Sequence, residues 1–511
     1  MSGFPFLSVL TLLPAVGALV IALLPRGRDL LVKQVALGWS LLVLVVTVVM
    51  CAGFDAGGHR FQFVESYPWI PQFGTRFGFG VDGIALVMLA LVAVLVPVVL
   101  LSSWNDAEPG RRSVKTFFAL MLLLETTMIG VFAATDVFLF YVFFEAMLVP
   151  MYFLIGSYGG PRREYAAVKF FLYSLVGGLL MLASVIGLYV VSTGALGHGT
   201  FSFAQLAALD IDPVVQRWLF LGFFVAFAIK APLFPFHTWL PDAGGQAPTG
   251  AGILLVGVLD KVGTFGFLRY CLPLFPEASR YFAPLAMALA VIGIFYGAFL
   301  AMGQSDLKRL VAYTSVAHFG FIAVGCFALT TQAGTGAVLY MVNHGLSTGA
   351  LFLVVGFLGA RRGSVLVEDF GGAARLMPWI GGAFLLAGLS SLALPGTNSF
   401  VSEFLVLIGT YPGNPVVSVI ATAGIVLAAL YVLWMYQRTM QGRLNPALPS
   451  VLPDLTRREA WAIGPVLVLV VVLGLYPKPV LEVITPAVTA TMHDVGAGDA
   501  IPAANVHGGG K

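Results

Sequence analysis

The stretch Phe224-Val225-Ala226-Phe227-Ala228-Ile229-Lys230-Ala231-Pro232-Leu233-Phe234-Pro235 places one lysine among apolar residues, with two prolines just beyond it. Of the 511 residues, 59% are hydrophobic and only 10% are charged, which indicates an integral membrane protein. An ionisable side chain inside lipid is costly and commonly belongs to an ion path or a proton relay. Prolines interrupt helices, and interrupted helices near mid-membrane form transport sites. The stretch therefore predicts a broken membrane helix that carries a functional lysine.

Composition argues against several other function classes. The net charge of +3 is too small to indicate a nucleic-acid partner. The three cysteines, Cys51, Cys271 and Cys326, lie far apart without a Cys-x-x-Cys motif, so neither a disulfide framework nor an iron–sulfur site is predicted. The sequence contains no P-loop, no glycine-rich dinucleotide motif and no His-Glu-x-x-His motif. We therefore expect this chain to bind no cofactor or metal of its own.

About fourteen segments are long and apolar enough to cross a bilayer, which takes about 20 residues per helix. The first follows only Met-Ser-Gly, without a basic segment, and is therefore expected to be a retained span rather than a cleaved signal. The sequence predicts an all-α membrane fold. The expected spans are 5–24, 34–53, 82–102, 115–134, 137–157, 166–191, 217–240, 249–271, 281–302, 307–327, 335–358, 378–411, 415–436 and 460–476.

Basic residues concentrate in alternate loops between these spans, as the positive-inside rule predicts for cytoplasmic loops. Eighteen of the 27 basic residues fall on one side, seven on the other, and Lys230 and Lys261 inside spans. An even number of spans with both termini on the periplasmic side fits this distribution. The predicted cytoplasmic set is Arg26, Arg28, Lys33, Arg111, Arg112, Lys115, Arg162, Arg163, Lys169, Lys308, Arg309, Arg361, Arg362, Arg375, Arg438, Arg443, Arg457 and Arg458.

The sequence also contains an internal repeat. After a shift of 170 residues, Thr135-Asp136-Val137 at the start of the fifth span matches Ser305-Asp306-Leu307 at the start of the tenth. The seventh span, interrupted at Pro232, corresponds to the twelfth, interrupted at residues 394–397. These matches predict two five-helix units, spans 4–8 and 9–13, and an odd helix number makes the repeat inverted. The expected divisions are 1–110 (three N-terminal helices), 111–275 (first repeat), 276–440 (second repeat) and 441–511 (final helix and tail).

Four charged side chains are expected in the middle third of the bilayer. Glu145 lies nine residues after Asp136, so about 14 Å into its span at the helical rise of about 1.5 Å per residue. By the same measure, Lys230 and Lys261 lie about 20 Å and about 17 Å along their helices. Glu403 follows Pro395 by eight residues, in the second half of the broken twelfth span. Histidines that titrate near neutrality lie in the same apolar stretches, at His237, His318 and His344.

These residue types suit proton transfer. A buried lysine loses its proton readily because desolvation disfavours the ammonium, and a nearby carboxylate restores the charged form. Moving or neutralising the carboxylate would release the proton to a neighbour, so an acid–lysine pair can act as a switch. Histidines and water can then connect such a pair to the two membrane faces. Glutamine or leucine at the same positions could not titrate.

Structural roles remain as alternatives. Glu145 and Lys230 could form a static ion pair that ties two helices together. Asp260 could pair with the adjacent Lys261 or face other polar groups. Glu125 could support the switch or hydrogen-bond between helices. The three histidines could be interhelical hydrogen-bonding groups rather than relay members. Because Asp136 and Asp306 follow Thr and Ser at span starts, we expect both to cap helices.

Four sequence words carry a resemblance to a known family. They are Phe-Tyr-Val-Phe-Phe-Glu-Ala-Met-Leu-Val-Pro-Met-Tyr (140–152), Lys-Ala-Pro-Leu-Phe-Pro-Phe-His-Thr-Trp-Leu-Pro-Asp-Ala (230–243) and Pro-Gly-Thr-Asn-Ser-Phe-Val-Ser-Glu-Phe (395–404), with Gln-Ala-Pro-Thr at 246–249. They resemble the antiporter-like membrane subunits of respiratory complex I, from span 3 to span 13. Chain M (chain 4) of that family carries glutamate in the twelfth span where its sister subunits carry lysine. Glu403 thus points to the chain M branch, in a bacterial version.

The resemblance implies a role for each matching residue. Glu145 would pair with Lys230, Lys261 would be the central lysine of the eighth span, and Glu403 the terminal acid toward the periplasm. His237, His318 and His344 match polar positions along the same axis, whereas Asp260 is not part of the family pattern. The resemblance also implies that NADH, FMN, iron–sulfur clusters and quinone belong to partner subunits.

Two classes of function remain open at this point. The first is a proton-translocating membrane subunit of NADH:quinone oxidoreductase, driven by redox chemistry elsewhere and assembled with neighbouring antiporter-like chains in the bacterial inner membrane. The second is a subunit of a multisubunit Mrp-type cation/proton antiporter. The membrane arm of a related hydrogenase shares the expected fold and is a third alternative.

Overall fold

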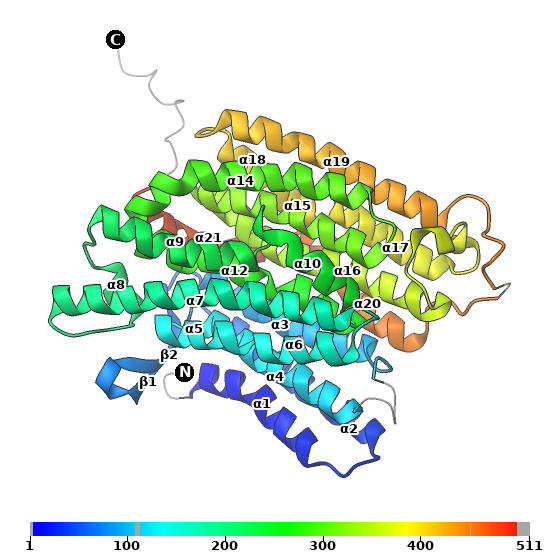
Figure 1. The fold of residues 1–511 in the computed structure, drawn as a ribbon, viewed down its shortest axis with the longest axis horizontal. Helices are drawn as coiled ribbons and strands as arrows, with labels where there is room; N and C mark the ends of the chain where they lie inside the picture. The colour runs from blue at the N-terminus through cyan, green and yellow to red at the C-terminus, as the bar shows by residue number, and fades with distance from the viewer. Residues whose placement is uncertain (1–3, 108–112, 450, 498–511) are drawn as a thin grey trace.

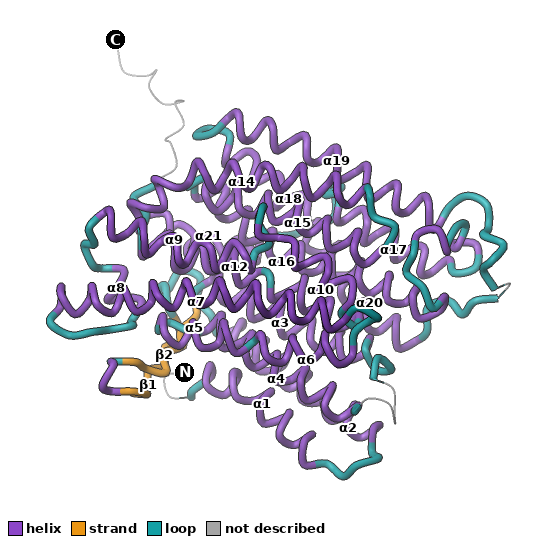
Figure 2. The backbone as a smooth tube through the Cα atoms, viewed as in Figure 1, coloured by secondary structure: helices purple, strands orange, loops and turns teal. Residues whose placement is uncertain are grey.

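The computed structural model describes residues 4–107, 113–449 and 451–497 and is almost entirely helical (Figures 1 and 2). The N-terminal part consists of α1 (Phe6–Leu23), α2 (Asp29–Ala52), β1 (Gln62–Ile70), β2 (Thr75–Val81) and α3 (Gly83–Ser102). The next part consists of α4 (Val114–Ala133), α5 (Val137–Ala146), α6 (Leu148–Tyr158), α7 (Arg163–Leu196), α8 (Phe203–Ala207), α9 (Pro213–Lys230), α10 (Trp239–Gln246), α11 (Thr249–Leu254), α12 (Lys261–Gly266) and α13 (Leu272–Leu274). The last part consists of α14 (Pro276–Met302), α15 (Leu307–Phe327), α16 (Thr331–Arg362), α17 (Pro378–Ser391), α18 (Asn398–Thr410), α19 (Pro415–Met440), α20 (Arg457–Leu475) and α21 (Lys478–Asp494).

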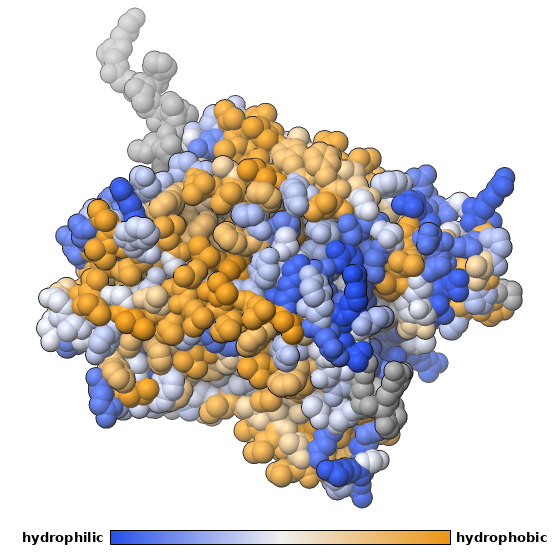
Figure 3. All heavy atoms as spheres, in the orientation of Figure 1, coloured by the Kyte–Doolittle hydropathy of each residue, from blue (hydrophilic) through white to orange (hydrophobic). Residues whose placement is uncertain are grey.

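The predicted membrane spans are confirmed. In the described residues, 13 helical segments are long and apolar enough to cross a bilayer, and each coincides with an expected span. The remaining expected span, 378–411, consists of the two shorter apolar helices α17 and α18. Hydrophobic atoms form a broad band over the helices, and hydrophilic atoms gather toward the two ends of the bundle (Figure 3). This is the surface of a protein embedded in lipid.

Three elements were not predicted from the sequence. Strands β1 and β2 form an antiparallel hairpin with Tyr67 opposite Phe77, at one end of the bundle (Figure 2). The short α8 lies between α7 and α9. Helix α21 follows α20 after two residues and contacts α3 and α16. All three escaped prediction because none is a 20-residue apolar run.

The two repeats begin with the same local structure. The Asp136 carboxylate accepts hydrogen bonds from the N–H groups of Phe138 and Leu139, and Asp306 caps α15 through the N–H of Arg309. Both predicted caps are therefore confirmed. Each start is also held by an isolated antiparallel bridge, Asp136 with Ser202 and Asp306 with Leu366. Equivalent capping and bridging at positions 170 residues apart support a duplicated unit.

The two broken helices share one pattern of backbone hydrogen bonds. At the end of α9, the N–H of Leu233 donates to Ala228 over 2.9 Å, and at the end of α17 the N–H of Leu394 donates to Leu389 over 3.0 Å. These turns are wider than an α-helical turn and end each half-helix. The correspondence aligns Lys230 with Ser391, the last residues of α9 and α17. The structural counterpart of Lys230 is thus Ser391, while Glu403 lies in the following half-helix α18.

The expected topology is also visible in the positions of the loops. The connections α1–α2, α6–α7 and α16–α17 lie at one end of the bundle, and the β-hairpin and α8 lie at the other (Figure 1). The basic residues in these three connections, among them Arg26, Arg162 and Arg375, belong to the predicted cytoplasmic set. Which compartment this end faces stays a prediction. Arg111, Arg112 and Lys511, which were part of the charge count, lie outside the described residues.

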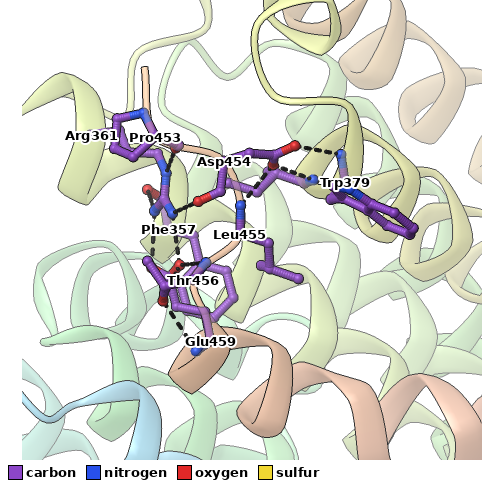
Figure 4. Close-up of polar contacts among 9 residues, drawn as sticks. Phe357, Arg361, Trp379, Pro453, Asp454, Leu455, Thr456 and Glu459 are labelled. Atoms are coloured by element: carbon purple, nitrogen blue, oxygen red, sulfur yellow. Dashed lines mark hydrogen bonds and ion pairs between the residues drawn. The ribbon is translucent and has the colours of Figure 1, made fainter. Parts of the chain in front are cut away.

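One tight ion pair fixes the end of α16 at this predicted cytoplasmic face (Figure 4). The Arg361 guanidinium donates to both carboxylate oxygens of Glu459 on α20, over 2.9 and 2.7 Å. It also donates to the backbone oxygens of Phe357, Pro453 and Asp454. Because both side chains are at least nine-tenths buried, this pair joins α16, α20 and the preceding loop in a water-poor environment.

Candidate functional site

Lys261 is the centre of a buried polar cluster. Its side chain is fully buried, and its Nζ lies 2.6 Å from Nδ1 of His344 and 3.0 Å from Oδ1 of Asp260. The backbone oxygen of Val256 is a third partner. The Phe319 ring centroid lies 5.1 Å from Nζ. Asp260 therefore pairs with Lys261, which settles the alternative left open by the sequence.

The helix around Lys261 departs from regular α-geometry. Residues 255–259 and 267–271 form π-type turns on either side of α12, which begins at Lys261. A π-turn widens the helix and frees backbone oxygens from their usual partners. This is why the oxygen of Val256 can accept a hydrogen bond from the lysine five residues later. The turns also bring the side chains of two consecutive residues, Asp260 and Lys261, within ion-pair distance.

Two histidines extend the cluster away from Lys261. The rings of His344 on α16 and His318 on α15 have centroids 5.5 Å apart. His318 Nδ1 lies 2.7 Å from the hydroxyl of Tyr340, and its Nε2 lies 3.3 Å from the hydroxyls of Ser391 and Tyr431. Lysine, two imidazoles and hydroxyl groups thus form a series of neighbouring titratable groups inside the bundle. No hydrogen bond joins the two imidazoles, because Nε2 of His344 has no partner within the described residues.

Glu403 stands at the far end of this series. Its side chain is buried, and Oε1 has no hydrogen-bond partner within the described residues. The carboxyl group lies close enough to Tyr340 and Tyr431 to interact with both electrostatically. These are the same two tyrosines that contact His318. The structure therefore brings Lys261, His344, His318 and Glu403 into one region, and their roles in proton transfer stay a prediction.

A seam of small polar side chains lines the same region and was missed from the sequence. Asn343 donates to the backbone oxygen of Asn398 over 2.7 Å and to Ser402 over 3.2 Å. Ser347 and Ser390 hydrogen-bond over 2.5 Å, and Ser390 donates to the Asn398 side chain over 2.6 Å. These contacts join α16 to both halves of the broken helix α17–α18. No charge marked them in the sequence, and serine is common in membrane helices for packing reasons alone.

Lys230 and Glu145 are neighbours without a direct bond. No hydrogen bond reaches Lys230 Nζ or Glu145 Oε1 within the described residues, yet the two charges are near enough to interact electrostatically. The ammonium of Lys230 lies over the rings of Phe144 and Phe170, at 4.9 and 5.6 Å from their centroids. The expected pair is therefore present in location but is not a closed ion pair.

Glycines set the position of both groups. A Cβ on Gly178 of α7 would lie 1.6 Å from Oε1 of Glu145, so the carboxyl group occupies space that only glycine leaves open. A Cβ on Gly263 of α12 would lie 2.4 Å from the backbone nitrogen of Ala231. Because Ala231 follows Lys230 and Gly263 follows Lys261 by two residues, this close approach packs the two lysine-bearing helices directly against each other.

The two other predicted residues lie apart from the central cluster. His237 is buried in the turn after the break of α9, next to the rings of Phe234 and Tyr296, and its Nδ1 has no partner within the described residues. Glu125 on α4 is fully buried, and neither carboxylate oxygen has a hydrogen-bond partner in the same set. The interhelical hydrogen bonds considered as their structural alternative are therefore not seen for Glu125 or for Nδ1 of His237.

Asp242 is a further charged residue that the sequence analysis did not select. It lies on the half-helix α10, and its carboxylate accepts hydrogen bonds from Lys169 over 2.7 Å and from Arg309 over 2.5 Å. Lys169 is on α7 in the first repeat and Arg309 is on α15 in the second. Asp242 thus clamps the half-helix after the break between the two repeats. The sequence feature that could have identified Asp242 is its position within the family-like motif 230–243, two residues before the pair Gly244-Gly245.

Comparisons with known proteins agree with this geometry. The family described as "NADH:quinone oxidoreductase/Mrp antiporter, TM" matches residues 134–429. The chain is 48% identical to the "NADH-quinone oxidoreductase subunit M" of Mycobacterium tuberculosis (strain CDC 1551 / Oshkosh) over 98% of this chain and 96% of that protein. It is similar to a chain of "Respiratory complex I from Thermus thermophilus with bound NADH", with a TM-score of 0.87 and 31% identity over 96% of this chain and all of the other. A chain of the "Mrp complex from Dietzia sp. DQ12-45-1b" shares the fold, with a TM-score of 0.80 and 22% identity over 96% of this chain and all of the other.

Proposed function

The chain belongs to the NADH:quinone oxidoreductase/Mrp antiporter family, and we propose that it is a subunit-M-type, proton-translocating membrane subunit of a respiratory NADH:quinone oxidoreductase. The observation that carries this proposal is the buried series Lys261–His344–His318 with Glu403 at its end. A row of titratable groups buried inside a membrane helix bundle is best explained by proton translocation across the membrane. The proposal that the chain is assembled into an NADH:quinone oxidoreductase is supported by its similarity to relatives named subunit M.

In this proposal, the residues act in sequence. Lys261 holds a proton stabilised by Asp260 and delivers it to His344, from which His318 and its hydroxyl partners lead to Glu403. Lys230 and Glu145 form the switch of the first repeat, and the open geometry of that pair leaves room for the carboxyl group to approach or withdraw. Packing of Gly263 against Ala231 transmits changes between the two lysine sites. His237 and Glu125 serve as supporting polar groups.

The chain would contribute translocation, not redox chemistry. NADH, FMN, iron–sulfur clusters and quinone would belong to partner subunits, and the other membrane subunits, including antiporter-like neighbours, would pack beside this chain in the bacterial inner membrane. Both termini would face the periplasm, as the distribution of basic residues predicts.

Purification of the native assembly tests the proposed complex. We expect flavin-containing and iron–sulfur subunits to co-purify with this chain, together with NADH:quinone oxidoreductase activity. An assembly of antiporter subunits without a flavoprotein would instead support the Mrp alternative, for which the present likeness shows the fold alone. A nickel-containing partner would support a hydrogenase. Either of the last two results would overturn the assignment.

The Glu145→Gln variant tests the proposed switch within the intact assembly. Glutamine keeps the size of the side chain but cannot be charged, so we expect proton pumping and coupled NADH oxidation to fall by about a hundredfold. Glu164→Gln is the matched control because Glu164 is exposed at the start of α7. Equal rates in the Glu145→Gln variant and this control would rule out the switch.

Gly178→Ala tests the position of the same carboxyl group. The added methyl would collide with Glu145 Oε1, so the carboxyl group of Glu145 would have to move away from the surface of α7. Displacement of a transfer group by an ångström can cost up to about a hundredfold in rate. We expect coupled NADH oxidation to fall, whereas Gly194→Ala on the same helix, which has open space around it, should leave the rate unchanged. Equal effects of the two variants would show that the Glu145 position is not critical.

A further inference from the structure

A polar cavity opens among the loops of the predicted cytoplasmic face. It has a volume of about 370 Å³, and its walls come from five connections that are far apart in the sequence. At about 30 Å³ per water molecule, the cavity has room for roughly ten waters. The wall residues used below are Asp106, Thr249 and Lys308, and we call this space the loop vestibule.

Asp106 supplies a carboxyl group to the loop vestibule. It follows α3 in a connection outside the membrane-spanning helices, and its Oδ2 is buried without a hydrogen-bond partner among the described residues. Burial raises the pKa of Asp106 above its ordinary value, while Lys308, the Ser103 hydroxyl, the Gly250 N–H and Arg458 act in the opposite direction. The carboxyl group can therefore take up and release a proton more readily than an exposed aspartate.

The vestibule adjoins the start of the helix that leads to Lys261. Thr249, in its wall, begins α11, and Lys261 follows twelve residues later, about 18 Å along the same span. On the facing helix α16, a Cβ on Gly356 would lie 2.3 Å from Thr249, and a Cβ on Gly345 would lie 2.8 Å from the backbone oxygen of Gly257. His344, the partner of Lys261, is the residue before Gly345. The α11–α16 seam thus runs from the vestibule to the lysine cluster.

Two residues of α16 lie along this seam between the vestibule and His344. The hydroxyl of Thr348, one turn from His344, is buried and has no partner within the described residues. Phe352, one turn further toward the vestibule, is fully buried, and its ring lies 3.3 Å from the position of a Cβ on Gly252 and 3.7 Å from that on Gly244. The Phe352 ring therefore packs between α10, α11 and α16, on the stretch of α16 between the vestibule and His344.

We propose that the loop vestibule is the water-filled entrance for protons bound for Lys261, with Asp106 as the proton acceptor at its mouth and Phe352 as the apolar barrier behind it. The Asp106 carboxylate takes a proton from a hydronium ion in bulk water, becomes a neutral carboxylic acid, and returns the proton to a cavity water. Passage to Thr348 and His344 then requires the Phe352 ring to move. This inference rests on the proposed function and names the uptake side of the same path.

The Asp106→Asn variant of the assembled complex tests the acceptor. Asparagine keeps the shape but cannot carry the proton, so we expect the rate of proton pumping to fall by about tenfold, less than for a residue inside the relay because cavity water remains. Asp106→Glu restores a titratable group and should recover most of the rate. Asp210→Asn, at an exposed position of the opposite end, is the matched control and should pump normally. A normal rate for Asp106→Asn, or no recovery with glutamate, would overturn the assignment of Asp106.

Thiol labelling tests the vestibule without relying on pumping. In a Cys51→Ser background, Asp106→Cys should react with a charged, membrane-impermeant thiol reagent added to one face only, whereas the native Cys271 and Cys326 are fully buried and should stay unlabelled. Failure of Asp106→Cys to react would show that the cavity is closed and would overturn the proposal. If Lys261→Met pumps normally in the intact assembly, the proposed relay itself fails. If it does not pump while Asp106→Asn does, only the present inference fails.

Discussion

Replacement of Lys261 by methionine is expected to lower proton pumping by about a hundredfold or more, the range associated with loss of a positioned proton-transfer group. Methionine fills a similar volume but can neither carry a proton nor donate a hydrogen bond to His344, so the series toward Glu403 loses its first member. The measurement is proton uptake and release by the assembled complex in sealed vesicles, together with its NADH oxidation rate. Lys478→Met, at an exposed position of α21, is the control and should not change either rate.

Two companion variants separate proton transfer from simpler effects. Lys261→Met leaves the Asp260 carboxylate buried without a partner, which by itself destabilises a protein by about 3–5 kcal/mol. The double variant Lys261→Met with Asp260→Asn removes that unpaired charge and should fold but still not pump. Lys261→Arg keeps a positive charge that is never released, so it should also fail. Full pumping by the arginine variant would show that Lys261 acts as a fixed charge, contrary to the proposed relay.

The membrane spans and the break at Lys230 could be predicted because each depends on a local property. Twenty apolar residues in a row leave little alternative to a spanning helix, and Pro232 and Pro235 cannot continue one. The caps at Asp136 and Asp306 follow from side-chain chemistry within three residues. The β-hairpin at 62–81 was missed because its signal is alternation over short stretches, which apolar composition conceals.

The members of the site could be selected from the sequence, but their contacts could not. Lys261, His318, His344 and Glu403 stood out because charge and imidazole are rare in lipid. That Lys261 meets both His344, 83 residues away, and the adjacent Asp260 depends on the π-type turns and on tertiary packing. The open geometry of Lys230 and Glu145 depends on Gly178, a residue whose role is visible only from what a Cβ would strike.

The largest effect on stability is expected from Arg361→Ala. In the structure, every N–H group of the Arg361 guanidinium finds an acceptor, two of them on Glu459 and three on backbone oxygens (Figure 4). Alanine would remove all five hydrogen bonds and leave the Glu459 carboxylate largely buried with only its contacts to Thr456. Breaking such a pair costs about 3–5 kcal/mol because the remaining charge stays desolvated. We therefore expect a clear drop in the thermal unfolding midpoint of the purified assembly.

The next residue provides a control of the same chemistry. Arg362 lies 3.9 Å from the Asp369 carboxylate, and both side chains are partly exposed, so Arg362→Ala should cost about 0–1 kcal/mol. The double variant Arg361→Met with Glu459→Leu should recover much of the stability, because a buried ion pair can be replaced by apolar side chains once neither charge is left alone. If Arg361→Ala unfolds at the same temperature as Arg362→Ala, the pair does not hold α16 and α20 together. If the double variant is no better than Arg361→Ala, the loss comes from the three backbone contacts, which anchor the loop before α20, rather than from the stranded carboxylate.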